Sequence, residues 1–155
     1  MPIRFNALDT SLVRALQAGY PDANGQPPER HISDGHGVPC RHCLTHVAEG
    51  DAYLVLAHRP FPALQPYAET GPIFLHAAAC PQYRDGGTVP PMLRSPQYIV
   101  RGYTESHRIV YGSGRVVPTP EIPLAAAEMF EDPRIGYVHV RSTSNTCYQC
   151  RIDRA

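Results

Sequence analysis

Two short segments that each end in cysteine constrain the fold of this chain more than any other feature. The first, residues 40–43, begins with Cys40 and ends with Cys43, and the second, residues 76–80, begins with His76 and ends with Cys80. Their spacing is C-x2-C followed, after a long gap, by H-x3-C. A C-x2-C turn can aim two sulfur atoms at one point because the chain reverses between them. The spacing therefore predicts that residues 40–43 and 76–80 fold against each other.

Three thiols and one imidazole form the donor set of a structural zinc site. Zinc prefers four tetrahedral ligands, and thiolate sulfur and imidazole nitrogen are common among them. We therefore predict one zinc ion bound by Cys40, Cys43, His76 and Cys80. Four protein ligands leave no open position for water, so the expected role is structural rather than catalytic. The alternatives are another ligand set or no metal, in which case these cysteines are small buried side chains.

The cysteine count and the apolar runs narrow the class of protein. The chain has 155 residues and five cysteines, and an odd number cannot pair completely within one chain. No apolar run approaches the roughly 20 residues that span a bilayer, and the first residues lack the apolar core of a signal peptide. We therefore expect a cytoplasmic protein, where reducing conditions disfavour structural disulfides.

Length and charge point to one domain without a nucleic-acid surface. A chain of 155 residues fits a single domain, residues 1–155. Its 14 basic side chains are all arginine and are balanced by 14 acidic ones. A net charge of zero predicts no basic face of the kind that neutralises phosphates, so we expect no nucleic-acid partner.

The apolar pattern predicts an α+β fold. Helices are expected over residues 8–18 and 122–130, where apolar residues recur at helical spacing. Strands are expected over 52–58, 72–76, 97–104, 108–111, 115–117, 135–141 and 147–153. The long connections 20–39, 59–71 and 77–96 are rich in proline or glycine. The sum is a mostly antiparallel sheet with two helices and long Pro/Gly-rich loops.

The last two predicted strands, residues 135–141 and 147–153, carry several polar side chains. Pairing across a turn at 142–146 gives three opposing pairs: Arg141 with Cys147, His139 with Gln149, and Tyr137 with Arg151. One interpretation is a site for a small anion, because arginine binds carboxylate and phosphate. Its expected ligand-binding residues are Arg101, His139, Arg141, Cys147 and Arg151. A sharper hypothesis makes Cys147 a nucleophile and His139 its base, and the simplest interpretation is a solvated sheet face.

Cys147 and Cys150 form a second C-x2-C pair. Residues three apart on a strand point to opposite faces, which argues against a shared metal ion. A redox pair normally sits at a helix N-terminus, and no helix is predicted there. We expect Cys150 to be a buried structural residue, with thiol redox or metal handling as the alternative. The histidines at 31, 36, 42 and 46 are expected to be exposed rather than to bind a second metal.

Several stretches together resemble one family: residues 39–44, 67–76, 101–103, 137–141 and 147–155. They are similar to the bacterial domain-of-unknown-function family 1203, which carries no established activity. The resemblance implies that more distant members keep residues like Cys40, Cys147, Arg151 and Arg154, which directs attention to the C-terminal polar face. Residues 40–80 also resemble treble-clef-like zinc knuckles, although Leu44 stands where many knuckles have glycine.

The function we expect is that of a zinc-stabilised small binding or accessory domain. Its expected partner is a small anionic ligand or a protein. The first alternative is a small enzyme or anion-binding protein that uses His139, Cys147 and the nearby arginines. The second alternative is a thiol redox or metal-handling protein. The sequence leaves the oligomeric state open.

Overall fold

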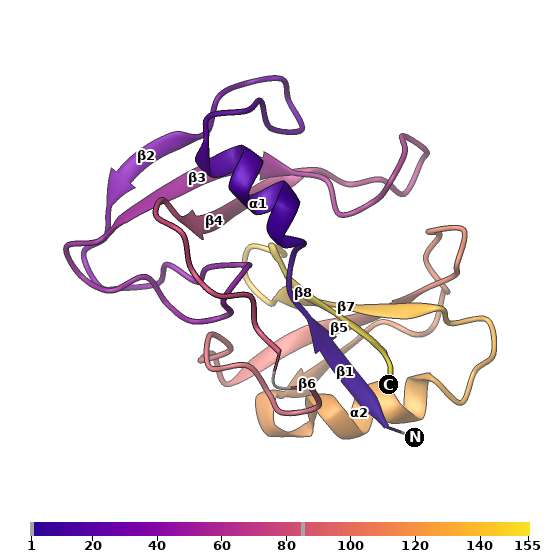
Figure 1. The fold of residues 1–155 in the computed structure, drawn as a ribbon. Coiled ribbons are helices and arrows are strands. Elements are labelled where there is room, and N and C mark those ends of the chain that lie inside the picture. Colours follow the sequence, from indigo (N-terminus) through magenta and orange to yellow (C-terminus); the bar gives the residue numbers. More distant parts are fainter. Residues whose placement is uncertain (1, 85) are drawn as a thin grey trace.

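In the computed structural model, residues 2–84 and 86–155 are described, and they form two antiparallel sheets with two α-helices (Figure 1). The expected α+β class is confirmed. The elements are β1 (Ile3–Asn6), α1 (Thr10–Gln17), β2 (Glu29–Ile32), β3 (Ala52–His58), β4 (Gly71–His76), β5 (Gln97–Tyr103), β6 (Arg115–Pro118), the 3-10 turn η1 (Thr119–Glu121), α2 (Ile122–Met129), β7 (Tyr137–Ser142) and β8 (Tyr148–Arg154). In the described part of the chain, neither helix has the length and apolar character needed to cross a bilayer.

The larger sheet has the strand order β1-β8-β7-β5-β6. Helix α2 lies against one face of it (Figure 1). Pro123 sits in the first turn of α2, where its missing N–H leaves no intrahelical bond unmade. The core beneath α2 contains Val100, Val138 and Ile152, one from each of the three central strands, and all three are fully buried.

The smaller sheet has the order β2-β3-β4, and α1 packs near it in the other half of the molecule (Figure 1). Helix α1 is amphipathic, with Val13 and Leu16 buried. These two side chains join a second core with Leu56 of β3 and Leu75 of β4. Buried residues recur at every second position in the middle of β3 and β4, with half-buried residues between them.

One strand prediction is wrong, and two strands were not predicted. Residues 108–111 do not form a strand, because only Ile109 makes an isolated bridge, to Tyr103. The partner of β5 on that side is β6. Strands β1 and β2 were not predicted, and β2 lies inside the expected loop 20–39. All four residues of β2 are exposed at the edge of its sheet, so it carries no apolar alternation that a sequence pattern could reveal.

The register of the last hairpin also differs from the prediction. The expected pairs Arg141–Cys147, His139–Gln149 and Tyr137–Arg151 are wrong. Arg141 lies opposite Tyr148 and His139 lies opposite Arg151, with a register shift between Val140 and Arg141. The shift arises because Val140 pairs with Cys150, which leaves Gln149 as one extra residue on β8, a β-bulge.

The bulge changes which face Tyr148 occupies. Without an extra residue, Tyr148 would share the face of Cys150, which lies in the core beneath α2. Instead the Tyr148 ring lies against His139, with ring centroids 4.9 Å apart. The bulge therefore closes the polar face of the larger sheet with an aromatic side chain.

Candidate metal centre

The first cysteine pair sits in a tight turn. The N–H of Leu44 donates to the carbonyl oxygen of Cys40 at 2.9 Å, and the N–H of Cys40 donates to Thr45 at 2.9 Å. Leu44 adopts a φ of 56°, the left-handed conformation that usually selects glycine. Its side chain is fully buried in the core beneath α2, and this burial offsets the cost of the conformation. The turn thus has knuckle geometry without a knuckle glycine.

The second pair reaches this turn because the turn is bonded to β4. Cys40 forms a parallel bridge with Phe74 of β4, and the N–H of Arg41 donates to the Phe74 carbonyl at 3.1 Å. His76 is the last residue of β4, and residues 77–80 bring Cys80 back beside it. Backbone pairing between distant segments, rather than the spacing alone, therefore sets the distance between the two pairs.

The ligand atoms of Cys40, Cys43, His76 and Cys80 all lie within 4.8 Å of one another. The sulfur atoms of Cys40 and Cys80 are 3.9 Å apart, and the Cys43 sulfur lies 3.4 Å from Nδ1 of His76. A tetrahedral zinc site with its usual bond lengths has S···S edges of ~3.8 Å and S···N edges of ~3.6 Å. Within residues 2–84 and 86–155, this is the only group of three or more Cys, His or carboxylate side chains that could hold a metal ion.

Two further donors stabilise the sulfur atoms. The backbone N–H of His76 donates to Cys40 Sγ at 3.3 Å. Nδ1 of His42 lies 3.2 Å from Cys80 Sγ, and its Nε2 lies 2.9 Å from Thr10 Oγ1. His42 is fully buried, so the expectation that it is exposed is wrong. With the threonine hydroxyl donating to Nε2, the Nδ1–H of His42 faces the sulfur, as outer contacts of metal ligands commonly do.

Helix α1 holds the second pair in place. Arg14 donates through Nη2 to the carbonyl oxygen of Cys80 at 2.8 Å. Gln17 donates through Nε2 to the carbonyl oxygens of His76 and Ala78, both at 2.9 Å. These side chains lie on one side of the helix, three residues apart. The helix therefore fixes the backbone on both sides of the turn that carries Cys80.

The three thiols influence one another's ionisation. Hydrogen bonds from the thiols of Cys43 and Cys80 lower the pKa of Cys40, whereas contact with Cys40 and Cys43 raises the pKa of Cys80. A second negative charge beside the first is unfavourable because like charges a few ångströms apart repel. A divalent cation at the centre of the group would remove that repulsion and allow all three thiols to ionise.

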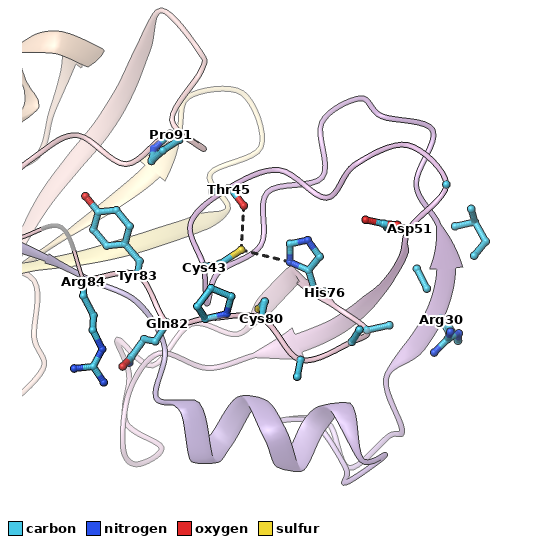
Figure 2. A pocket seen from close by; sticks show the side chains of 17 residues that line it. Arg30, Cys43, Thr45, Asp51, His76, Cys80, Gln82, Tyr83, Arg84 and Pro91 are labelled. Carbon is cyan, nitrogen blue, oxygen red and sulfur yellow. Dashed lines mark hydrogen bonds between the residues drawn. The ribbon is translucent and has the colours of Figure 1, made fainter.

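The group is buried on one side and open on the other. Cys40 and Cys80 are buried, whereas Cys43 and His76 are only half-buried. Figure 2 shows Cys43 between Thr45 and His76 at the wall of a cavity of about 910 Å³. Solutes can therefore approach the group from the edge formed by Cys43 and His76.

The structure brings together three residues of the predicted anion site in a row across the larger sheet. Arg101 of β5 lies opposite His139 of β7, which lies opposite Arg151 of β8. Arg141 is two residues further along β7, and so it faces the same side. Cys147 lies outside the strands and shares a separate, smaller cavity with Arg141.

The part of this face around His139 and Arg141 is not solvated, contrary to the simplest expectation, whereas the Arg151 side chain is 40% exposed. His139 and Arg141 are 1% and 5% exposed. The imidazole of His139 is surrounded by aromatic rings at centroid distances between 4.7 and 5.4 Å, those of Phe61, Tyr103, Tyr137 and Tyr148. Burial, followed by the neighbouring arginines, holds the pKa of His139 well below its usual value, so its ring is neutral near pH 7.

The two cysteines of the C-terminal pair have different surroundings. Cys150 is 1% exposed in the core beneath α2, as expected of a structural residue. Burial raises the pKa of Cys150 to about 12. Cys147 is half-buried, and its backbone N–H donates to the Ser142 hydroxyl oxygen at 3.0 Å. In the described part of the chain, no hydrogen bond joins Cys147 to His139, which is enclosed by rings.

The fold and the site define an α+β protein with a Cys₃His group that could hold one metal ion. A family profile described as "Protein of unknown function (DUF1203)" matches residues 37–154, and the chain belongs to this family. The matched range contains all four residues of the metal group and the polar face of the larger sheet. No curated protein and no solved structure matches the chain.

Proposed function

We propose that this protein is a small binding domain stabilised by one structural zinc ion, held by Cys40, Cys43, His76 and Cys80. The observation that carries the proposal is the convergence of the four ligand atoms within 4.8 Å. The ion would join the turn at residues 40–43 to the end of β4, two segments far apart along the chain.

The donor set favours zinc over other cations. Three sulfurs and one imidazole suit zinc, whereas magnesium and calcium take oxygen ligands. The outer hydrogen bonds to Cys40 and Cys80 lie on the buried side, where thiolates need donors in place of water. Four protein ligands complete the tetrahedron, so the metal would stabilise the fold and would not activate water.

The test is the metal content of protein purified without chelators. Elemental analysis should give close to one equivalent of zinc per chain. Cys80→Ser should lose that zinc, whereas Cys150→Ser, which removes a buried thiol elsewhere, should keep it. Less than a tenth of an equivalent in the wild type, or equal zinc in Cys80→Ser and the wild type, would refute the proposal. An iron–sulfur cluster would be recognised by its visible absorption and would equally refute it.

A further inference from the structure

The guanidinium group of Arg141 is buried, and two of its three nitrogen atoms have no hydrogen-bond partner among the described residues. Its side chain is 6% exposed. Nη1 donates to the carbonyl oxygen of Thr146 at 3.0 Å and lies 3.6 Å from a carboxylate oxygen of Glu69. Nε and Nη2 have no hydrogen-bond partner among the described residues. Buried polar groups in proteins almost always have hydrogen-bond partners. A bound ligand would therefore explain why these two nitrogen atoms have none among the described residues.

The two unused donors specify the shape of that ligand. Nε–H and Nη2–H lie along one edge of the planar guanidinium and point in the same direction. This edge binds two oxygen atoms of a carboxylate or phosphate side by side. A ligand that uses both donors of Arg141 must therefore carry two oxygens on one atom.

A cavity lies beside the group. Arg141 lines a space of about 210 Å³ together with His58, Glu69, Cys147 and Tyr148. Nε2 of His58 is also buried without a partner, so it can donate to a second atom of the same ligand. The volume lies below the roughly 300–1,000 Å³ of drug-sized sites, which restricts the ligand to a few heavy atoms.

The surrounding charges specify the charge of the ligand. Arg101 donates to Glu69 at 2.7 Å, and Arg151 donates to Asp153 at 2.7 Å. These two arginines, which the sequence placed in an anion site, are therefore already paired with carboxylates. Arg141 shares Glu69 only at 3.6 Å. Three arginines facing two carboxylates leave one positive charge without a counterion.

We propose that Arg141 and His58 bind a small monocarboxylate in this cavity, with Cys147 at its wall. The carboxylate would accept both free donors of Arg141, and its short apolar part would lie against Pro60 and Pro72, which also line the space. The site shares no residue with the metal group, so it stands whether or not zinc is bound.

The first test follows the Arg141 Nε–H signal by ¹⁵N–¹H NMR while sodium acetate replaces sodium chloride at constant ionic strength. The signal should shift and saturate in the zinc-loaded wild type. Arg141→Lys keeps the charge but loses the two-donor edge, and its affinity for acetate should fall at least tenfold. The matched control is Arg134→Lys, because Arg134 is exposed and pairs with Asp132, and it should bind acetate as the wild type does. An unsaturated wild-type titration, or equal affinity in Arg141→Lys, would overturn the proposal.

Alkylation of Cys147 gives a second measurement. Acetate should slow the reaction of Cys147 with iodoacetamide severalfold and leave the rate at Cys43, which lines another cavity, unchanged. If Arg141→Lys does not fold, Glu69→Gln decides, because removing the neighbouring carboxylate should tighten acetate binding. Weaker acetate binding in Glu69→Gln, no protection of Cys147, or tighter binding of inorganic phosphate than of acetate would each count against a monocarboxylate site.

Discussion

Leu44 combines a backbone conformation suited to glycine with a fully buried side chain. Truncation to alanine removes the buried side chain, at a cost of roughly 2–5 kcal/mol, and keeps the left-handed strain. Truncation to glycine loses the same packing but relieves about 1 kcal/mol of strain. We therefore expect Leu44→Gly to be more stable than Leu44→Ala by about 1 kcal/mol, measured by urea unfolding with zinc in excess.

The control for this comparison is Leu56, a buried residue within β3. Glycine weakens a strand interior relative to alanine, so Leu56→Gly should be less stable than Leu56→Ala. The same order at both positions would mean that the conformation of Leu44 carries no strain.

His42 acts on the metal group through Cys80. Its contact with the sulfur at 3.2 Å should orient the ligand and stabilise its negative charge. Loss of such an outer partner typically weakens metal binding by about 10–100-fold, and we expect His42→Ala to do so in a zinc competition assay with a chromophoric chelator. His46→Ala is the control, because His46 contacts the Met92 carbonyl instead. Equal zinc affinity in His42→Ala and wild type would show that the contact is only packing.

The lowered pKa of His58 predicts how the free energy of unfolding depends on pH. Burial, and then the charge of Arg41, lower the pKa of His58 from 6.5 to about 4. The unfolded chain therefore binds more protons between these values, and the free energy of unfolding falls as the pH drops from 6.5 towards 4. The contribution of His58 is fully present above pH 6.5 and reaches up to about 3 kcal/mol.

His58→Gln removes this titration, so its stability should change less with pH than that of the wild type. Unfolding by urea at a series of pH values, with equal zinc in both proteins, checks the difference. Acid displaces zinc from thiolates in both chains, so only the difference between the two curves reports His58. Parallel curves from pH 7 to pH 4.5 would contradict the assignment.

Among the elements, α1 has the clearest link to the site. Gln17 holds the carbonyl oxygens of His76 and Ala78, and each hydrogen bond is worth about 0.5–1.5 kcal/mol. Gln17→Ala should therefore speed the release of zinc to a chelator severalfold while the helix itself persists. Ser11→Ala, on the exposed side of α1, should release zinc at the wild-type rate. Similar rates in all three proteins would show that α1 does not hold this segment.

The strands and the metal group that were predicted correctly each have a recognisable pattern in their own residues. Residues 52–58 form an apolar run that is followed by Arg59 and Pro60, and β3 has the same bounds, Ala52–His58. Residues 40–43 and 76–80 were predicted to meet from ligand chemistry, and their atoms do converge. In each case the sequence pattern that allows the prediction lies in the same residues that form the strand or the metal group.

The features that the sequence did not predict depend on distant partners. Strand β2 exists because β3 offers it an edge, and its own residues are all exposed. The bulge at Gln149 depends on how β8 pairs with β7, and it alone brings Tyr148 onto the face of His139. His58 and Arg141 meet at one cavity although no spacing links them. Only the three-dimensional register could reveal these contacts.

At the scale of the molecule, the metal group belongs to one of two cores. Cys40 and Cys80 pack with the apolar residues of α1, β3 and β4. The core of the larger sheet lies beneath α2 and contains neither of them. Leu44 packs in that core from the turn that carries the ligands, and Tyr148 of β8 packs in the core of the smaller sheet, so the two halves meet at these side chains. Because Cys40 and Cys80 lie in the core of the smaller sheet, loss of the metal should destabilise mainly that sheet.

Hydrogen exchange with and without metal tests this division. Removal of zinc with a strong chelator should reduce the protection of backbone amides in α1, β3 and β4, because their shared core loses the bond between residues 40–43 and 76–80. Amides in β5 and β7, which pair with each other through six residue positions from Tyr98–Ser142 to Tyr103–Tyr137, should keep most of their protection. Cys80→Ser should reproduce the pattern without a chelator, and Cys150→Ser should instead weaken β7 and β8. Equal loss of protection in both sheets on zinc removal would mean that the two cores unfold as one unit, and that the metal stabilises the whole chain rather than the half that binds it.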